Sequence, residues 1–234
     1  MASAMDKLEK YLSERVEINN VDTRLLSEVA YERLQDAIKL AVLQPGEPLS
    51  ETRISRALGI SRTPVREALQ RLAKDGLVQV IPGRAVTVAA PSLHEVLDAL
   101  HIRGLLEPEV VRLAAEALPE DEGKVLQDLT AEMERVARAG DRTAWTKLDI
   151  KWHEFLSHSC PNHLLGQMVL QARNRMYNRG AGEHVLDQYI IDGTLEHKQV
   201  VEAILAGDGE AAERHMREHI RNLRENLFKR LARY

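Results

Sequence analysis

The sequence predicts a mainly α-helical protein in two parts, a small α+β domain near the N-terminus followed by an all-α bundle of six helices. Three observations predict this class. Apolar residues recur at helical spacing through most of the 234 residues, two β-prone runs stand together in the first third, and only 4% of residues are aromatic. A core with so few aromatic rings is expected to be aliphatic and helical.

The chain begins with a polar, charged stretch, residues 1–22, which we interpret as a loosely attached N-terminal extension with a possible short helix over 4–16. The first clear helix is predicted over 25–43, where apolar residues recur at helical spacing before the turn-forming pair Pro45 and Gly46.

Two further helices follow in quick succession. The first, within 49–60, is predicted to be capped by Ser50 and to end at Gly59, which supplies a tight turn. In the second, Thr63 is suited to the cap and Pro64 to the first helical position. Its apolar stripe is Val65, Leu69 and Leu72, and its other face carries Arg62, Arg66 and Gln70. A basic face beside the positive end of a helix dipole is typical of a helix that reads DNA.

Two short strands are predicted next, over 77–81 and 85–88, joined by a turn at Pro82-Gly83 with Arg84 near its tip. Helix, turn, basic helix and two-stranded wing in this order predict a winged helix-turn-helix domain over 23–90. The alternative is a small α+β domain whose arginines only solvate its surface.

From about Thr23 to Ala89, and most closely from Leu49 to Val88, this pattern resembles the GntR family of bacterial regulators. The resemblance implies a double-stranded DNA operator as partner and DNA contacts from Arg53, Ser61, Arg62, Thr63, Arg66 and Gly83. Charge alone adds Arg84 and, less directly, Arg56. Arg62 or Arg66 is suited to bidentate contact with guanine, whereas Ser61, Thr63 and Arg53 are better placed on phosphates.

The remainder, residues 91–234, is predicted to be an all-helical domain long enough to hold a pocket. Pro and Gly residues separate six predicted helices, at 92–117, 119–139, 141–158, 162–180, 184–206 and 208–232. This part is acidic, with 24 Asp and Glu residues against 19 Lys and Arg residues, whereas residues 23–90 carry ten basic against seven acidic residues. A basic head on an acidic body suits a regulator whose body stays off DNA.

Composition also bears on the compartment. The sequence contains no apolar run of about 18 residues, so no membrane span is expected. Neither a signal peptide nor an intrachain disulfide is expected, because the N-terminus lacks a basic-then-apolar pattern and Cys160 is the single cysteine. We therefore expect a cytoplasmic protein.

Four residues of the second part form a candidate metal set, Asp149, His153, His197 and His219. Asp149 and His153 are four residues apart, so a helix would place them on one face, and a bundle can bring the other two histidines to the same point. One carboxylate and three imidazoles suit a divalent ion such as Zn²⁺, Ni²⁺ or Mn²⁺. His215 is a rival to His219, and His158 and His184 are weaker candidates.

The second part also resembles the FCD effector domain of the FadR-type branch of the GntR family. The resemblance rests on Arg103 four before Glu107, the Asp149/His153 pair, Glu196-His197, and Met216 three before His219. It implies a metal-containing member that senses a small carboxylate or sugar acid. Arg103 is a candidate to bind that anion, its alternative being an internal ion pair with Glu107; Asn174 and Asn178, with Arg173 and Arg175, are further candidates to line the pocket.

These observations predict a homodimeric transcription regulator, more often a repressor in this family, that binds a palindromic operator and responds to an anionic effector held at a metal. Three alternatives stay open: a metal-dependent enzyme, a regulator with a purely structural metal, and a regulator for which the metal itself is the signal. The sequence contains no HExxH motif and no activated nucleophile, which disfavours the enzyme.

Overall fold

The computed structural model describes residues 4–13, 23–81, 85–177 and 187–231, and the chain divides after Ser92 into two compact units. The last described turn of α8, from Asn174, groups with the first unit. Gly83, Arg84, Asn178 and His184, all named above as candidates, lie outside the described residues.

The first unit contains four helices among its described residues: α1 (Ala4–Ser13), α2 (Thr23–Lys39), α3 (Glu51–Leu58) and α4 (Arg62–Lys74). Apolar side chains from all four helices form one buried cluster, which includes Leu34, Ile54, Leu69 and Leu72. Helix α2 ends at Lys39, earlier than expected, and Ala41 follows with a φ of 55°.

Helix α1 is part of that core, so the expectation of a loosely attached extension is wrong for residues 4–13. Met5, Leu8 and Leu12 recur at helical spacing, and all three are buried in the cluster. Helix α1 packs chiefly on α3. The prediction missed this packing because much of the segment is polar or charged, so three apolar residues gave only a weak helical pattern.

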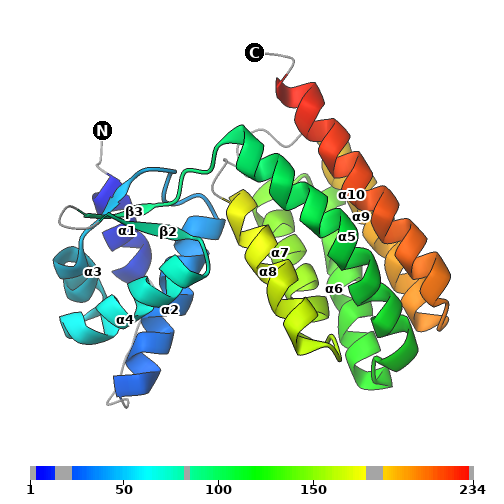
Figure 1. The fold of residues 1–234 in the computed structure, drawn as a ribbon, viewed down its shortest axis with the longest axis horizontal. Coiled ribbons are helices and arrows are strands. Elements are labelled where there is room, and N and C mark those ends of the chain that lie inside the picture. Colours follow the sequence, from blue (N-terminus) through cyan, green and yellow to red (C-terminus); the bar gives the residue numbers. More distant parts are fainter. Residues whose placement is uncertain (1–3, 14–22, 82–84, 178–186, 232–234) are drawn as a thin grey trace. The chain divides into compact units, whose positions relative to one another are not determined.

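A three-stranded antiparallel sheet completes the first unit, with strand order β1-β3-β2 (Figure 1). Strands β2 (Val78–Ile81) and β3 (Ala85–Val88) are the predicted wing, and Val80 pairs with Val86. Strand β1 (Pro48–Leu49) has only two residues, too few for a sequence pattern, and pairs Leu49 with Val86.

Helix α3 begins and ends as the sequence predicts, whereas the start of α4 differs from the prediction. Ser50 caps α3 by accepting from the backbone N–H of Arg53, and Gly59 ends the helix with a φ of 68°. Helix α4, however, begins one residue before Thr63, with Ser61 as its N-cap residue. Thr63 and Pro64 therefore lie within the first turn, where proline is tolerated because those N–H groups have no intrahelical partner.

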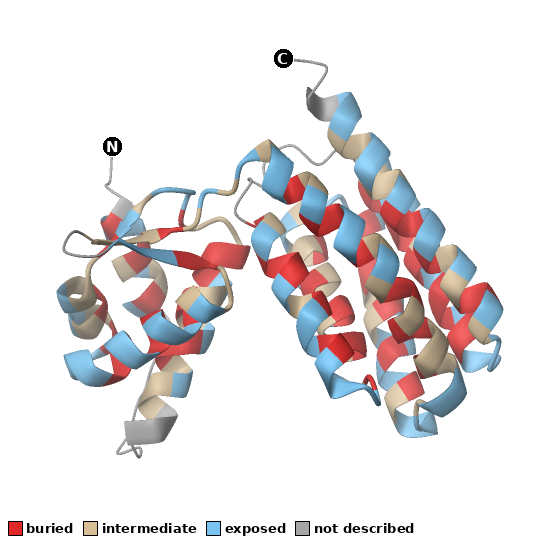
Figure 2. Cartoon of the chain, viewed as in Figure 1, coloured by how far each residue is buried: buried red, intermediate tan, exposed pale blue. Residues whose placement is uncertain are grey.

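Six helices form the described part of the second unit: α5 (Leu93–Ala117), α6 (Glu120–Arg138), α7 (Arg142–His158), α8 (His163–Tyr177), α9 (Asp187–Leu205) and α10 (Gly209–Leu231). Of α8, the residues up to Arg173 belong to this unit. The predicted six-helix bundle is confirmed. Helix α5 runs through Pro108 and packs most extensively on α10. Figure 2 shows the buried residues as stripes along the helices, and their apolar members form one core, mostly aliphatic but with Trp145 and Trp152 inside it.

None of the described helices combines the length and apolar character that a bilayer crossing requires.

Candidate functional site

The exposed face of α4 carries the residues expected to read DNA. Ser61, Arg62, Thr63 and Arg66 are all exposed at the start of the helix, whereas Val65 and Leu69 point into the core. The side chains of Arg62 and Arg66 are 60% and 57% exposed. Because the core face and the arginine face are separate, the arginines are presented to solvent without disturbing the packing of α4.

Both of these arginines contact one acid, Glu51 at the start of α3. Arg66 donates from Nε and Nη2 to the two carboxylate oxygens, at 3.2 Å and 2.9 Å, and Arg62 donates from Nη2 at 3.3 Å. These hydrogen bonds hold the pKa of Glu51 below its usual value. No local pattern in the sequence distinguishes Glu51, because its partners lie 11 and 15 residues away.

Arg53, expected on a phosphate, is held by α1. Its Nη2 lies 2.5 Å from Asp6 Oδ1 and 2.8 Å from Glu9 Oε2, and its Nε lies 2.6 Å from Glu9 Oε1. The hydrogen bonds that Arg53 donates to Glu9 and then to Asp6 raise the pKa of Arg53 above its usual value. Arg56, added on charge, is exposed on the same helix.

Three imidazoles meet inside the second unit. His153 on α7, His197 on α9 and His219 on α10 are buried, and each offers a ring nitrogen within 4.8 Å of the other two. The Nε2 atoms of His153 and His197 are 3.1 Å apart. Trp152 packs edge-on against both of these rings, at 4.7 Å and 4.4 Å between centroids, and closes the apolar side of the group.

Asp149 lies beside this group, one helical turn before His153. Its Oδ1 is 3.3 Å from Nε2 of His197 and 3.7 Å from Nε2 of His153. Ligand atoms that bind one ion at about 2.1 Å are separated by about 3 Å to 3.4 Å in octahedral or tetrahedral geometry. The structure therefore brings three of the four predicted ligands, the histidines, into one group, and places Asp149 beside two of them, His153 and His197.

The opposite nitrogen of each ring faces an acceptor. Nδ1 of His197 is 2.5 Å from the carbonyl oxygen of Gly193, and Nδ1 of His219 is 2.8 Å from Oε2 of Glu196. Nδ1 of His153 lies 3.2 Å from Oε2 of Glu107. A proton on each Nδ1 would satisfy these acceptors and would leave the Nε2 atoms free to bind a metal.

Carboxylates and guanidinium groups surround the rings. Although burial opposes ionisation, Arg103 and Arg173 hold the pKa of Glu107 well below its usual range. Burial, with the nearby Arg173 charge, lowers the pKa of His153, and burial also lowers that of His219. Neutral imidazoles beside ionised carboxylates are the protonation states that bind a divalent ion.

The predicted effector contacts have a mixed outcome. Nε of Arg103 donates to Oε1 of Glu107 at 2.5 Å in a buried ion pair, which is the internal alternative considered for this residue. Asn174 is buried, and Arg173 Nη2 lies 3.4 Å from Oδ2 of Asp149. His158 is exposed at the end of α7, and His215 is not a member of the three-histidine group.

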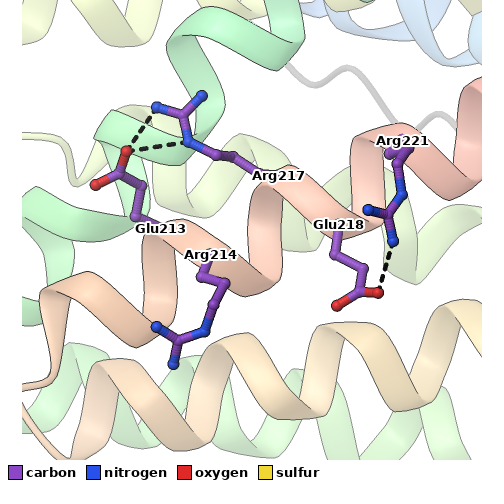
Figure 3. Close-up of a pocket in the computed structure, with 5 residues that line it drawn as sticks. All are labelled: Glu213, Arg214, Arg217, Glu218 and Arg221. Atoms are coloured by element: carbon purple, nitrogen blue, oxygen red, sulfur yellow. Dashed lines mark hydrogen bonds and ion pairs between the residues drawn. The ribbon is translucent and has the colours of Figure 1, made fainter.

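An open pocket lies along α10, lined by Glu213, Arg214, Arg217, Glu218 and Arg221 (Figure 3). Arg217 pairs with Glu213 and Arg221 with Glu218, each within one turn of the helix. Such pairs along a solvent-exposed helix are typical of a charged surface, and we assign this pocket no function.

Comparison with known proteins agrees with both halves of this description. Residues 26–88 match the family of bacterial regulatory proteins called the gntR family, and residues 98–222 match the FCD domain. The HTH-type transcriptional repressor RspR of Escherichia coli is 27% identical over 88% of this chain and 90% of its own. The E. coli HTH-type transcriptional regulator McbR is 30% identical over 74% of this chain and 77% of its own.

The solved structure of E. coli McbR/YncC has the same fold, with a TM-score of 0.79 over 91% of this chain and all of that one, at 24% identity. The matched relatives are transcriptional regulators rather than enzymes, which sets aside the metal-dependent enzyme. The chain therefore belongs to the GntR family of bacterial regulatory proteins, in the branch whose second domain is an FCD domain.

Proposed function

We propose that this transcriptional regulator is a cytoplasmic homodimeric repressor that binds a palindromic operator and is controlled by a small carboxylate or sugar acid bound at a metal. The observation that carries the sensing half is the convergence of His153, His197 and His219 beside Asp149 in the interior of the second unit. The resemblance of the first unit to a DNA-binding domain supports the other half.

On the DNA side, Arg62 and Arg66 are the proposed base readers, because they are the most exposed cations at the start of α4. Ser61 and Thr63 are proposed phosphate contacts, with Gly83 and Arg84 added from the wing tip. A phosphate contact from Arg53 requires its guanidinium to leave Asp6 and Glu9, so we place this residue after the others in importance.

On the sensing side, Asp149 and the three histidines would hold Zn²⁺, Ni²⁺ or Mn²⁺, and the ion would supply Lewis acidity to hold an anion. The buried charges support an anionic effector. With neutral imidazoles, the carboxylates of Glu107, Asp149 and Glu196 outnumber the guanidinium groups of Arg103 and Arg173 by one. A divalent ion reverses this balance to a single positive charge, which one carboxylate neutralises.

Arg103 is proposed to act indirectly, since its ion pair with Glu107 places it behind His153. Arg103 holds Glu107, and Glu107 faces Nδ1 of His153, so the chain of contacts fixes the orientation of a metal ligand. Direct contacts with the effector are proposed for Asn174, which is buried, and for Asn178.

The proposed homodimer is supported by apolar residues that the second unit leaves exposed. Ile102 and Leu105 on α5 are 43% and 53% exposed, and Leu164 and Met168 on α8 are 66% and 47% exposed. The buried ion pair of Glu107 with Arg173 shows that α5 and α8 are neighbours. Apolar side chains on adjacent helices are what a self-complementary interface buries.

A thermal-shift screen of small carboxylates and sugar acids, run with and without a chelator, tests the sensing proposal. We expect at least one anion to raise the melting temperature of the metal-loaded protein and to have no effect after chelation. A purely structural metal would instead lower the melting temperature on removal without any anion response. Operator affinity that follows metal concentration alone would identify the ion itself as the signal.

A further inference from the structure

We propose that Glu51 is a positioning residue that determines base specificity, by holding Arg66 so that one edge of its guanidinium group faces the operator. This inference rests on the proposed function, since it requires α4 to enter a DNA groove. Glu51 is an acid that contacts two exposed arginines, Arg62 and Arg66. It is not among the residues expected to contact DNA.

The geometry of the contact defines which edge is used. Arg66 places Nε and Nη2 against the two oxygens of Glu51, at 3.2 Å and 2.9 Å. A guanidinium group offers its N–H donors in a rigid, planar fork. Because Glu51 occupies the side formed by Nε and Nη2, the end formed by Nη1 and Nη2 stays directed away from the carboxylate. That end can make the bidentate contact with guanine O6 and N7.

Glu51 is less exposed to solvent than the two arginines that it contacts. The Glu51 side chain is 24% exposed, whereas those of Arg62 and Arg66 are 60% and 57% exposed. The carboxylate is thus less accessible to an approaching duplex than the two guanidinium groups are. Glu51 is the first residue of α3, so its contacts join the two helices of the helix-turn-helix across their turn.

The stability that Glu51 can add is small, because exposed ion pairs contribute little to folding and an acid at the start of a helix such as α3 contributes only about 0.3–1 kcal/mol. Its charge also repels phosphates and lowers the affinity of the surface for any duplex. The contact restricts the conformation of the Arg66 side chain before DNA binds. An arginine side chain loses considerable conformational entropy on binding, and Glu51 imposes part of that loss in the free protein. Glu51 therefore favours base discrimination at the expense of generic affinity.

This trade predicts two opposite effects in Glu51→Ala. Affinity for a mixed-sequence duplex should rise at least about twofold, with a steeper dependence on salt, because one negative charge leaves the surface. In selection from a pool of randomised duplexes, discrimination at the base pair read by Arg66 should fall by about tenfold. Arg66→Ala locates that base pair, and Glu51→Gln, which keeps one acceptor oxygen, should fall between wild type and Glu51→Ala.

Glu28→Gln is the matched control, because Glu28 is an exposed acid of the same unit paired with Arg71 at 2.7 Å. It should leave base discrimination unchanged. The inference is overturned if Glu51→Ala keeps wild-type discrimination. It is also overturned if discrimination falls at a different base pair from the one lost in Arg66→Ala, since Glu51 would then read a base itself. A wild-type protein that selects no sequence would instead refute the proposed function, and this inference with it.

Discussion

Oδ1 of Asp149 and Nε2 of His197 lie 3.3 Å apart, although the two residues belong to different helices, α7 and α9. The contact joins the helical pair Asp149 and His153 to a histidine that the sequence places far away. Each imidazole of the group has its Nδ1 near an acceptor, so a proton on each Nδ1 would leave the Nε2 atoms as electron-pair donors. This is a set of groups whose mutual repulsion a cation relieves.

Replacing His197 with alanine should remove the metal, because the remaining ligands no longer surround the ion. We expect less than one tenth of the metal content of wild type in purified His197→Ala, measured by elemental analysis at pH 7.5. His215→Ala is the control, since His215 lies outside the group and should retain full occupancy. Full retention in His197→Ala would refute the assignment.

Glu196→Gln should weaken metal binding without removing a ligand. The Glu196 carboxylate accepts from Nδ1 of His219 and from the side-chain amide of Asn222, and it increases the basicity of the imidazole. Loss of a carboxylate that hydrogen-bonds to a metal-binding histidine lowers metal affinity by about 10- to 100-fold. Competition with a fluorescent chelator measures the change, and Glu202→Gln, an exposed acid on the same helix, should bind as wild type does.

Arg66→Ala should weaken specific operator binding by about 10- to 100-fold, through lost discrimination at one base pair. It should leave the protein folded, because the Arg66 side chain is 57% exposed and contributes no core contact. A mobility-shift assay on a promoter fragment and a thermal melt measure the two effects. Arg71→Ala removes the same charge from another face of α4, where Arg71 stacks on Tyr31. An equal loss of binding in both variants would mean that Arg66 acts only through its charge.

The acids of α1 should oppose DNA binding if Arg53 contacts phosphate. In the double variant Asp6→Asn with Glu9→Gln, Arg53 loses the charged partners that hold it. We expect tighter binding to generic duplex, with a steeper salt dependence, since the surface gains positive charge. Helix α1 should stay in place, because Leu8 and Leu12 are fully buried. Unchanged affinity would restrict Arg53 to anchoring α1.

Gly166→Ala should destabilise the bundle by about 1–3 kcal/mol, as expected for overpacking. A Cβ atom at Gly166 would lie 2.0 Å from the carbonyl oxygen of Ser157, so α8 must move away from α7. Gly104→Ala is the matched control, because its Cβ would meet Ile220 at 3.5 Å, an ordinary contact. Chemical denaturation of the two variants gives the comparison, and an equally stable Gly166→Ala would contradict the described packing of α8.

The sequence was sufficient for features that depend on local patterns. The order of helices, the wing strands β2 and β3, and the cap of α3 by Ser50 all follow from spacing and residue type. The sequence also indicated the candidate metal ligands that the structure places near one another, although only the helical pair Asp149 and His153 follows from spacing without the family resemblance.

Features that depend on long-range contacts were not predicted. Nothing in the sequence pairs Glu51 with Arg66, or Arg53 with Glu9, because such ion pairs depend on which helix faces pack together. The packing of α1 was missed because three apolar residues in a charged segment give a weak signal. The ion pair of Arg103 with Glu107 was only one of two readings, since an arginine at that spacing suits a ligand or an acid equally well.

The most direct test of the central claim measures binding of the metal-loaded protein to a labelled duplex from its own promoter, by fluorescence anisotropy at low and moderate salt. The account predicts tight binding to that duplex over a scrambled one, with affinity that changes when the effector found by thermal shift is added and does not change after chelation. Equal affinity for promoter and scrambled duplexes at low salt, with or without metal and anion, would contradict it.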